Sequence, residues 1–83
     1  MSVAVLVLMG SPSDWETMQE TGRVLDTLGV TWDAHVTSAH RSPERTLELV
    51  RCGDEEGVRV FICGAGLAAH LAGVVASHTV RPV

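Results

Sequence analysis

An uninterrupted apolar run near the start of the chain constrains its fold more than any other feature. Residues 3–9 read Val-Ala-Val-Leu-Val-Leu-Met. A half-exposed strand would alternate apolar and polar positions, whereas a strand buried on both faces is apolar throughout. Such strands lie inside parallel sheets that helices cover on both sides. The run therefore predicts a central parallel strand in an α/β fold.

Two further strands are predicted from the rest of the sequence. Residues 30–37 alternate apolar and polar positions, which favours a place near the edge of the sheet. Residues 58–63 form another mainly apolar run, and residues 81–83 resemble the start of a fourth strand.

The first helix is predicted to follow residues 3–9. Ser13 and Glu16 have the spacing of a capping box, and Ser11-Pro12 offers an overlapping cap with proline at the first position. Gly29 marks the expected end of this helix. Its expected buried stripe consists of Trp15, Met18, Gly22, Leu25 and Leu28.

Two more helices complete the alternation of strands and helices. The second is predicted to begin at Ser42-Pro43 and to end at Gly57, and the third covers residues 67–78. This order favours a three-layer αβα fold around a parallel sheet of flavodoxin-like type, with strand order 2-1-3-4-5 cut short after about three strands. We expect residues 1–83 to be a single incomplete α/β domain, the N-terminal part of a larger one.

Composition excludes several classes of function. The chain has a net charge of −4 with six basic residues, all arginine, which argues against nucleic acid as a partner. No run reaches the roughly 18 apolar residues of a membrane span, and the N-terminus lacks the basic region of a signal peptide. Cys52 and Cys63 form no CxxC motif, so we expect reduced thiols and a cytoplasmic protein. The 46% hydrophobic share is high for 83 residues and indicates surface that neighbouring subunits or further chain would cover.

A turn of small or polar residues follows each predicted strand. These turns are residues 10–14 (Gly-Ser-Pro-Ser-Asp), residues 38–41 (Ser-Ala-His-Arg) and residues 64–66 (Gly-Ala-Gly). Ligands of such folds bind at the carboxyl ends of the strands. The three turns therefore predict one site, in which His40 can exchange a proton and Arg41 can bind phosphate or carboxylate.

Each turn also has a purely structural interpretation. Ser11, Ser13 and Asp14 could act only as helix caps, although a helix N-terminus is also a ready phosphate site. Residues 64–69 match the loose G-x-G-x-x-A pattern of dinucleotide sites, but the pattern follows the third strand. His70 and His78 lie eight residues apart, too far along a helix to share a metal.

Three motifs together resemble one family. Residues 9–15 (MGSPSDW) resemble the MGSxSDW turn of the PurE family, the N5-carboxyaminoimidazole ribonucleotide mutases of purine biosynthesis. Residues 38–43 (SAHRSP) are similar to its SAHRTP loop, and residues 64–73 resemble its GAGGAAHLPG segment. Leu67 and Ala72 depart from that segment, where the family usually has Gly and Pro. The family continues for roughly as long again beyond the matched part.

The resemblance implies an isomerase that moves a carboxylate from N5 to C4 of aminoimidazole ribonucleotide without metal or organic cofactor. His40 would be the general acid and then the general base. It implies a small ribonucleotide substrate, a homo-octamer with sites near subunit contacts, and no nucleic-acid or membrane partner. The residues expected to bind the substrate are Ser11, Ser13, Asp14, Ser38, Ala39, Arg41, Gly64, Ala65, Gly66 and His70.

Three alternatives stay open. An aminoimidazole ribonucleotide carboxylase would use free CO2, although residues 68–71 (Ala-Ala-His-Leu) look like the mutase branch. A dinucleotide-binding enzyme would use the turn at residues 64–69. An inactive partial chain would keep only the ligand-binding edge of the sheet.

Overall fold

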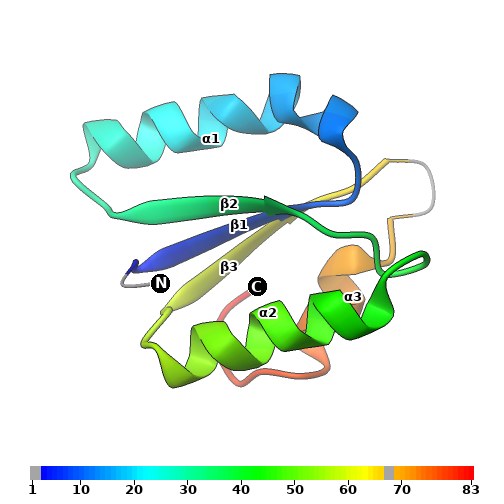
Figure 1. The fold of residues 1–83 in the computed structure, drawn as a ribbon. Coiled ribbons are helices and arrows are strands. Elements are labelled where there is room, and N and C mark those ends of the chain that lie inside the picture. Colours follow the sequence, from blue (N-terminus) through cyan, green and yellow to red (C-terminus); the bar gives the residue numbers. More distant parts are fainter. Residues whose placement is uncertain (1–2, 67–68) are drawn as a thin grey trace.

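A single parallel sheet of three strands forms the centre of the computed structural model, which describes residues 3–66 and 69–83 (Figure 1). Strand β1 is Val5–Met9, β2 is Trp32–Val36 and β3 is Val60–Gly64, in the order β2-β1-β3. Both pairings are parallel, and the last residue of β1 lies opposite the last residue of each neighbour. The predicted order 2-1-3 is confirmed, and the carboxyl ends of all three strands meet at one edge.

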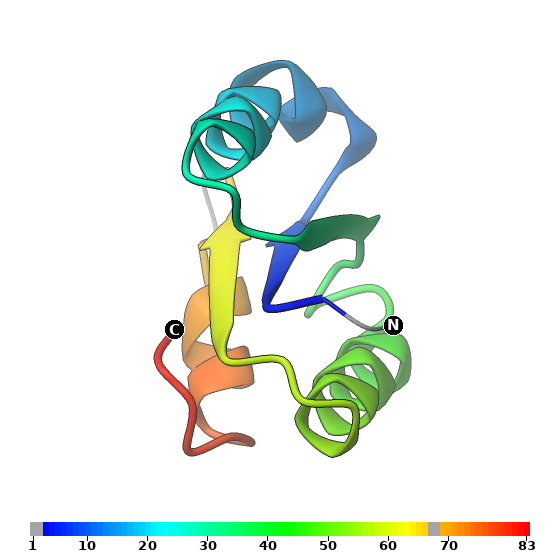
Figure 2. The same cartoon turned by 90° about the vertical axis from the view of Figure 1, so that its left-hand side faces the viewer.

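Helices cover both faces of this sheet. A short 3-10 helix, η1 (Pro12–Asp14), leads into α1 (Trp15–Thr27), which lies on one face. Helices α2 (Pro43–Glu55) and α3 (Leu71–Ala76) lie together on the other face (Figures 1 and 2). The three-layer αβα architecture is confirmed. No helix within the described residues is long and apolar enough to span a membrane.

The core divides into two parts because neighbouring residues of β1 point to opposite faces. All five residues of β1 are buried, as its uninterrupted apolar run predicts. On the side of α2 and α3 the buried cluster comprises Leu6, Leu8, Val50, Val58, Phe61, Leu71 and Val75. On the side of α1 it comprises Val5, Val7, Met9 and Leu25.

The start and the stripe of α1 differ from the prediction. Ser11 caps η1, with its hydroxyl accepting from the N–H of Ser13, whereas the expected capping box gives no side-chain cap at the start of α1. Trp15 is 41% exposed, although its ring lies against Trp32 on the edge strand, with ring centroids 6.3 Å apart. Leu28 is 67% exposed, since α1 has already ended at Thr27.

The C-terminal part of the chain also corrects two expectations. Helix α3 begins at Leu71 and ends at Ala76, so it is shorter than residues 67–78, of which 67 and 68 lie outside the described residues. Residues 81–83 are not a strand. The N–H of Phe61 in β3 donates to the carbonyl oxygen of Pro82 at 3.0 Å, but proline has no N–H with which to continue a ladder.

Candidate functional site at the carboxyl edge of the sheet

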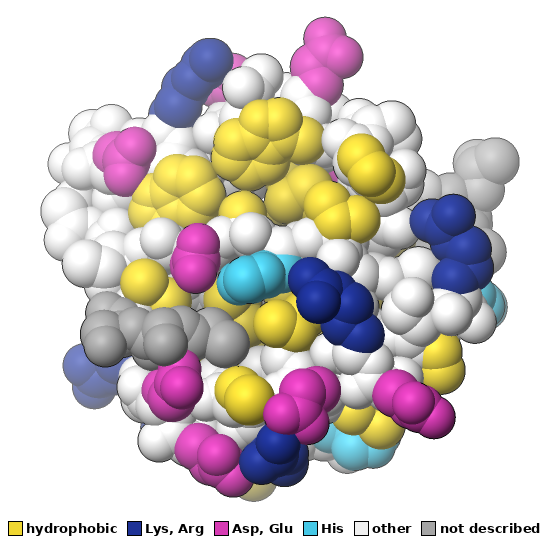
Figure 3. All heavy atoms as spheres, in the orientation of Figure 1, with side chains coloured by type: hydrophobic (Ala, Val, Ile, Leu, Met, Phe, Trp, Pro, Cys, Tyr) yellow, Lys and Arg dark blue, Asp and Glu magenta, His cyan; other side chains and the backbone are white. Residues whose placement is uncertain are grey.

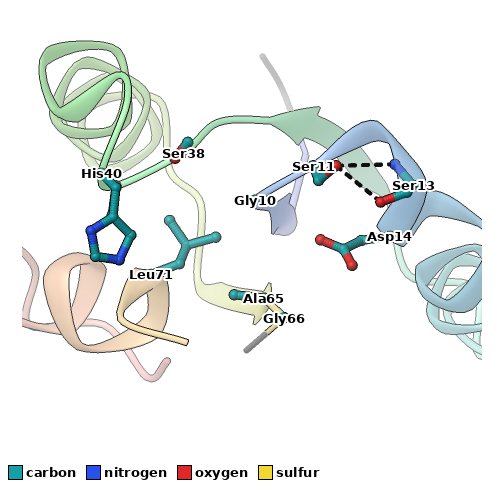
Figure 4. A pocket seen from close by; sticks show the side chains of 10 residues that line it. Gly10, Ser11, Ser13, Asp14, Ser38, His40, Ala65, Gly66 and Leu71 are labelled. Atoms are coloured by element: carbon teal, nitrogen blue, oxygen red, sulfur yellow. Dashed lines mark hydrogen bonds between the residues drawn. The ribbon is translucent and has the colours of Figure 1, made fainter. Parts of the chain in front are cut away.

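A cavity of about 210 Å³ lies where the three strands end (Figure 4). The segment that follows each strand forms one wall of the cavity. These segments, with the first residue of α3, supply the lining residues Gly10, Ser11, Ser13, Asp14, Ser38, Ala39, His40, Ala65, Gly66 and Leu71. The predicted clustering of Ser11, His40 and Gly66 at one sheet edge is confirmed.

The first wall is the turn from β1 into η1. Ser11 has extended backbone, and its hydroxyl oxygen lies 3.3 Å from the N–H of Ser13 and 3.0 Å from the Ser13 hydroxyl. The side chain of Asp14 points toward the centre of the cavity (Figure 4). Hydroxyls and the N–H groups at the start of a helix favour an anion, while the Asp14 carboxylate suits hydroxyl donors.

The second wall is the loop from β2 into α2. The N–H of Ser42 donates to the carbonyl oxygen of Ser38 at 2.8 Å, and the N–H of Arg41 donates to the Ser38 hydroxyl at 3.1 Å. These bonds close a tight turn that presents His40 at its tip. The Arg41 guanidinium reaches back to the carbonyl oxygen of Gly10 at 3.4 Å, which joins the second wall to the first.

His40 meets a second imidazole at the mouth of the cavity. His40 Nε2 and His70 Nδ1 lie 3.0 Å apart, and the ring centroids are separated by 4.9 Å. One nitrogen of this pair must donate and the other accept, so the contact couples the tautomers of the two rings. His70 occupies the N-cap position of α3, and both imidazoles are exposed to solvent.

The third wall is the backbone that follows β3. The N–H of Gly10 donates to the carbonyl oxygen of Gly64 at 3.1 Å, which holds the ends of β1 and β3 together. A Cβ at Gly64 would lie 2.4 Å from the sulfur of Met18, so a larger residue there would require the Met18 side chain to move. At Gly66, apart from its chain neighbours, no atom of the described residues lies within 4 Å of the position of a Cβ, which leaves this backbone open to a ligand.

Three of the predicted site residues do not line the cavity. Arg41 and Gly64 both form a hydrogen bond with Gly10, and His70 forms one with His40. Each of the three therefore contacts a residue that lines the cavity. The predicted residues that do line it are Ser11, Ser13, Asp14, Ser38, Ala39, His40, Ala65 and Gly66.

Two lining residues, Gly10 and Leu71, were absent from the predicted set. Gly10 belongs to the first polar turn and could have been found there. Leu71 carries no polar atom, and only its position as the first residue of a helix at the sheet edge could have indicated it.

The thiols take no part in this arrangement. Cys52 and Cys63 are both free. Burial raises the pKa of the Cys63 thiol to about 11, so it stays protonated at neutral pH and is a poor nucleophile. Within the described residues no group of three or more His, Cys, Asp or Glu side chains could hold a metal ion.

Comparison with known proteins adds a family. A family model described as "AIR carboxylase" matches residues 4–83. An N5-carboxyaminoimidazole ribonucleotide mutase from Brucella melitensis is 48% identical over all of this chain and 51% of the relative. The mutase of that name from Bacillus subtilis is 46% identical over all of this chain and 51% of the relative.

The fold has a match among solved structures. The crystal structure of Treponema denticola PurE aligns with a TM-score of 0.86 at 26% identity, over 90% of this chain and 48% of that one. The chain spans about half the length of the curated relatives it matches.

Proposed function

The chain belongs to the AIR carboxylase family, and from that premise we propose that it carries the ribonucleotide-binding edge of an N5-carboxyaminoimidazole ribonucleotide mutase. The reaction is an isomerisation in purine biosynthesis that moves a carboxylate from N5 to C4. The observation that carries the proposal is the meeting of three separate family-like motifs around one cavity with His40 on its wall.

His40 suits both proton transfers of this reaction. The carboxylate leaves the exocyclic nitrogen as CO2 when His40 delivers a proton to that nitrogen. Ring carbon C4 then bonds to CO2, and His40 takes the proton that C4 releases. One imidazole can perform both steps if it lies over the ring, and the proton count of His40 is restored at the end.

The first two walls suit the ribonucleotide part of the substrate. Ser11, Ser13 and the start of η1 offer hydroxyls and N–H groups, and Arg41 offers a guanidinium for the phosphate. Asp14 would accept from the ribose hydroxyls. Ser38 and Ala39 form the side of the cavity that carries His40.

The third wall suits the ring and the transient CO2. The backbone of Gly64, Ala65 and Gly66 brings small groups to the cavity, where larger side chains would exclude a planar ring. We assign His70 to the support of His40, which it contacts at 3.0 Å.

Trapping CO2 requires an enclosed, dry site. The cavity of about 210 Å³ is smaller than the roughly 300–1,000 Å³ of enclosed ligand pockets. We propose that residues 1–83 form one incomplete α/β domain and that further chain or neighbouring subunits of a cytoplasmic homo-octamer complete the enclosure. The half-length match to the relatives supports this view.

The alternative is a carboxylase that joins aminoimidazole ribonucleotide to free CO2. The names of the relatives favour the mutase. The test uses two proteins, the 83-residue chain by itself and the chain joined to the C-terminal half of the Bacillus subtilis relative. Each protein is given either N5-carboxyaminoimidazole ribonucleotide or aminoimidazole ribonucleotide. The mutase converts the first substrate without bicarbonate, whereas conversion of only the second, with bicarbonate, would contradict the proposal.

A further inference from the structure

Two buried threonines lie beneath the loop that carries His40. Thr37 and Thr46 are 2% and 0% exposed, and they are the buried polar side chains within residues 3–66 and 69–83. Their hydroxyl oxygens are 2.8 Å apart. Thr37 directly follows β2, and Thr46 lies in the first turn of α2, so residues 38–42 span the gap above this contact.

The direction of the hydrogen bond between them follows from a second contact. The Thr46 hydroxyl also donates to the carbonyl oxygen of Ser42 at 3.1 Å. A hydroxyl has a single proton, so Thr46 cannot donate to Thr37 as well. Thr37 therefore donates to Thr46, and Thr46 donates to Ser42, in a continuous relay.

Each end of this relay is fixed to a regular element. The N–H of Thr37 donates to the carbonyl oxygen of Met9 at 2.8 Å, which extends the pairing of β1 and β2 by one residue. The N–H of Thr46 donates to the carbonyl oxygen of Ser42 at 3.1 Å, and this bond closes the first turn of α2. The hydroxyl pair thus fastens the sheet to the helix across the base of the loop.

Besides the backbone bond from the Ser42 N–H to the Ser38 carbonyl oxygen, two exposed bonds of Arg41 also hold the loop, and these two are weaker anchors. The bond from the Arg41 N–H to the Ser38 hydroxyl and the bond from Arg41 to Gly10 are exposed, so water competes for their donors and acceptors. A buried bond lacks that competition, and leaving its donor without a partner is costly.

We propose that the buried Thr37–Thr46–Ser42 relay positions the loop of residues 38–42 so that His40 faces His70 across the mouth of the cavity. Thr37 and Thr46 are positioning residues, since neither lines the cavity. The catalytic consequence rests on the proposed function, but the placement of the loop does not.

The relay makes the two threonines unequal. Thr46→Val leaves the Thr37 proton buried without an acceptor and removes the donor to Ser42. Thr37→Val removes only the first bond and leaves Thr46 bonded to Ser42. Thr46→Ser keeps the hydroxyl and should restore the relay.

Hydrogen–deuterium exchange read by mass spectrometry tests the proposal. We expect the amides of Arg41 and Ser42 to exchange about tenfold faster in Thr46→Val, less so in Thr37→Val, and as in the wild type in Thr46→Ser. The amides of β1 should be unchanged. Thr27→Val, which removes a hydroxyl bonded to the Arg23 carbonyl on α1, is the matched control and should leave the loop unaffected.

The exchange of the imidazole Cε1 hydrogen gives a readout specific to His40. The exchange rate of His40 should change in Thr46→Val and return to the wild-type value in Thr46→Ser, while that of His78, which follows the end of α3, stays constant. The proposal would be overturned if the exchange of the loop amides and of His40 were unchanged in Thr46→Val. It would also be overturned if, in Thr37→Val, the amides of β1 and the amides of the loop lost protection equally. If Thr46→Val does not fold, the comparison of Thr37→Val with the wild type decides. Absence of mutase turnover in the wild-type protein would contradict the proposed function, but it would not affect the conclusion about the placement of the loop.

Discussion

Arg41 stands between two walls of the cavity. Its backbone N–H donates to Ser38 and its guanidinium donates to the Gly10 carbonyl oxygen at 3.4 Å. A guanidinium this close to the start of η1 can turn toward a phosphate held there with little rearrangement. We therefore expect Arg41 to contribute to substrate binding and not to proton transfer.

Arg41→Ala should weaken ribonucleotide binding by about 1.5–3 kcal/mol, because a charge-assisted contact is lost. The measurement is the dissociation constant by titration calorimetry. Arg45→Ala is the matched control, since the Arg45 guanidinium bonds to the carbonyl oxygen of Val36 and Arg45 does not line the cavity. Equal affinity of the Arg41→Ala variant and the wild type for the ribonucleotide would show that Arg41 does not contribute to substrate binding.

Single residues differ in how well the sequence reveals them. Arg41 does not line the cavity. His40 does, and it could be predicted because it lies in the loop that follows β2 and carries an imidazole. Thr46 and Leu71 could not, since a threonine or a leucine inside a helix is typical of core packing. Only the contacts of the folded chain distinguish Thr46, through its hydroxyl bonds to Thr37 and Ser42.

The packing of α1 on β2 depends on one glycine. A Cβ on Gly22 would lie 2.4 Å from the ring of Trp32, whose indole N–H donates to Asp26 at 2.7 Å. The ring is held by that bond and cannot move away freely. Helix α1 therefore approaches the sheet as closely as a glycine allows.

Gly22→Ala should lower the free energy of unfolding by about 1–3 kcal/mol through this overpacking. Gly73→Ala on α3 is the control, because a Cβ there would meet no atom of the described residues within 4 Å outside its own helix turn. Alanine there should be neutral or stabilising by up to about 1 kcal/mol. Urea unfolding of the three proteins measures both changes, and a neutral Gly22→Ala would contradict the packing described.

Strand β3 carries a titrating thiol. Burial raises the pKa of Cys63 from 9.0 to about 11. Above pH 9 the unfolded chain loses this proton while the folded chain keeps it, so the unfolded state is favoured as the pH rises.

Stability should therefore fall between pH 9 and pH 11, and Cys63→Ala should remove part of that fall. Below pH 9 the thiol is protonated in both states and contributes no slope. Urea unfolding at several pH values measures the effect. If the free energy of unfolding falls equally with pH in the wild type and in Cys63→Ala, the Cys63 thiol is not responsible for the fall.

Elements with one dominant signal were predicted well, and those with competing signals were not. The apolar run of β1 and the proline start of α2 leave little choice of structure. Helix α3 is built of Ala, Gly and Val beyond its first residue, and since Gly and Val are weak helix formers its length depends on tertiary packing. The first turn held two overlapping caps, and only the folded chain shows that Ser11 is the one used.

The whole molecule is compact yet incompletely covered. Its radius of gyration of 11.7 Å matches the roughly 12 Å expected of a folded chain of this length. Hydrophobic side chains nonetheless gather on the face formed by α1 and β2 (Figure 3). The large exposed apolar residues on these two elements and just after α1 are Trp15, Val24, Leu28 and Val36. The hydrophobic share of the sequence indicated such a surface but not its place.

We expect the 83-residue chain to associate in solution, because an exposed strand edge with apolar neighbours favours contact with other chains. Light scattering after size exclusion should give a mass above 8.8 kDa that rises with concentration. A monomer with a cooperative thermal transition independent of concentration would contradict this expectation.

We propose that the three strand ends form one ribonucleotide site with His40 as its proton shuttle. The most direct test is turnover of N5-carboxyaminoimidazole ribonucleotide by His40→Asn and by the wild type, each joined to the C-terminal half of the Bacillus subtilis relative. Substrate binding is measured separately, and His78→Asn serves as the control histidine. Turnover should fall by at least about 10²–10⁴-fold with binding largely retained, because one imidazole serves both proton transfers. Near-normal turnover by His40→Asn would show that His40 is not the proton shuttle.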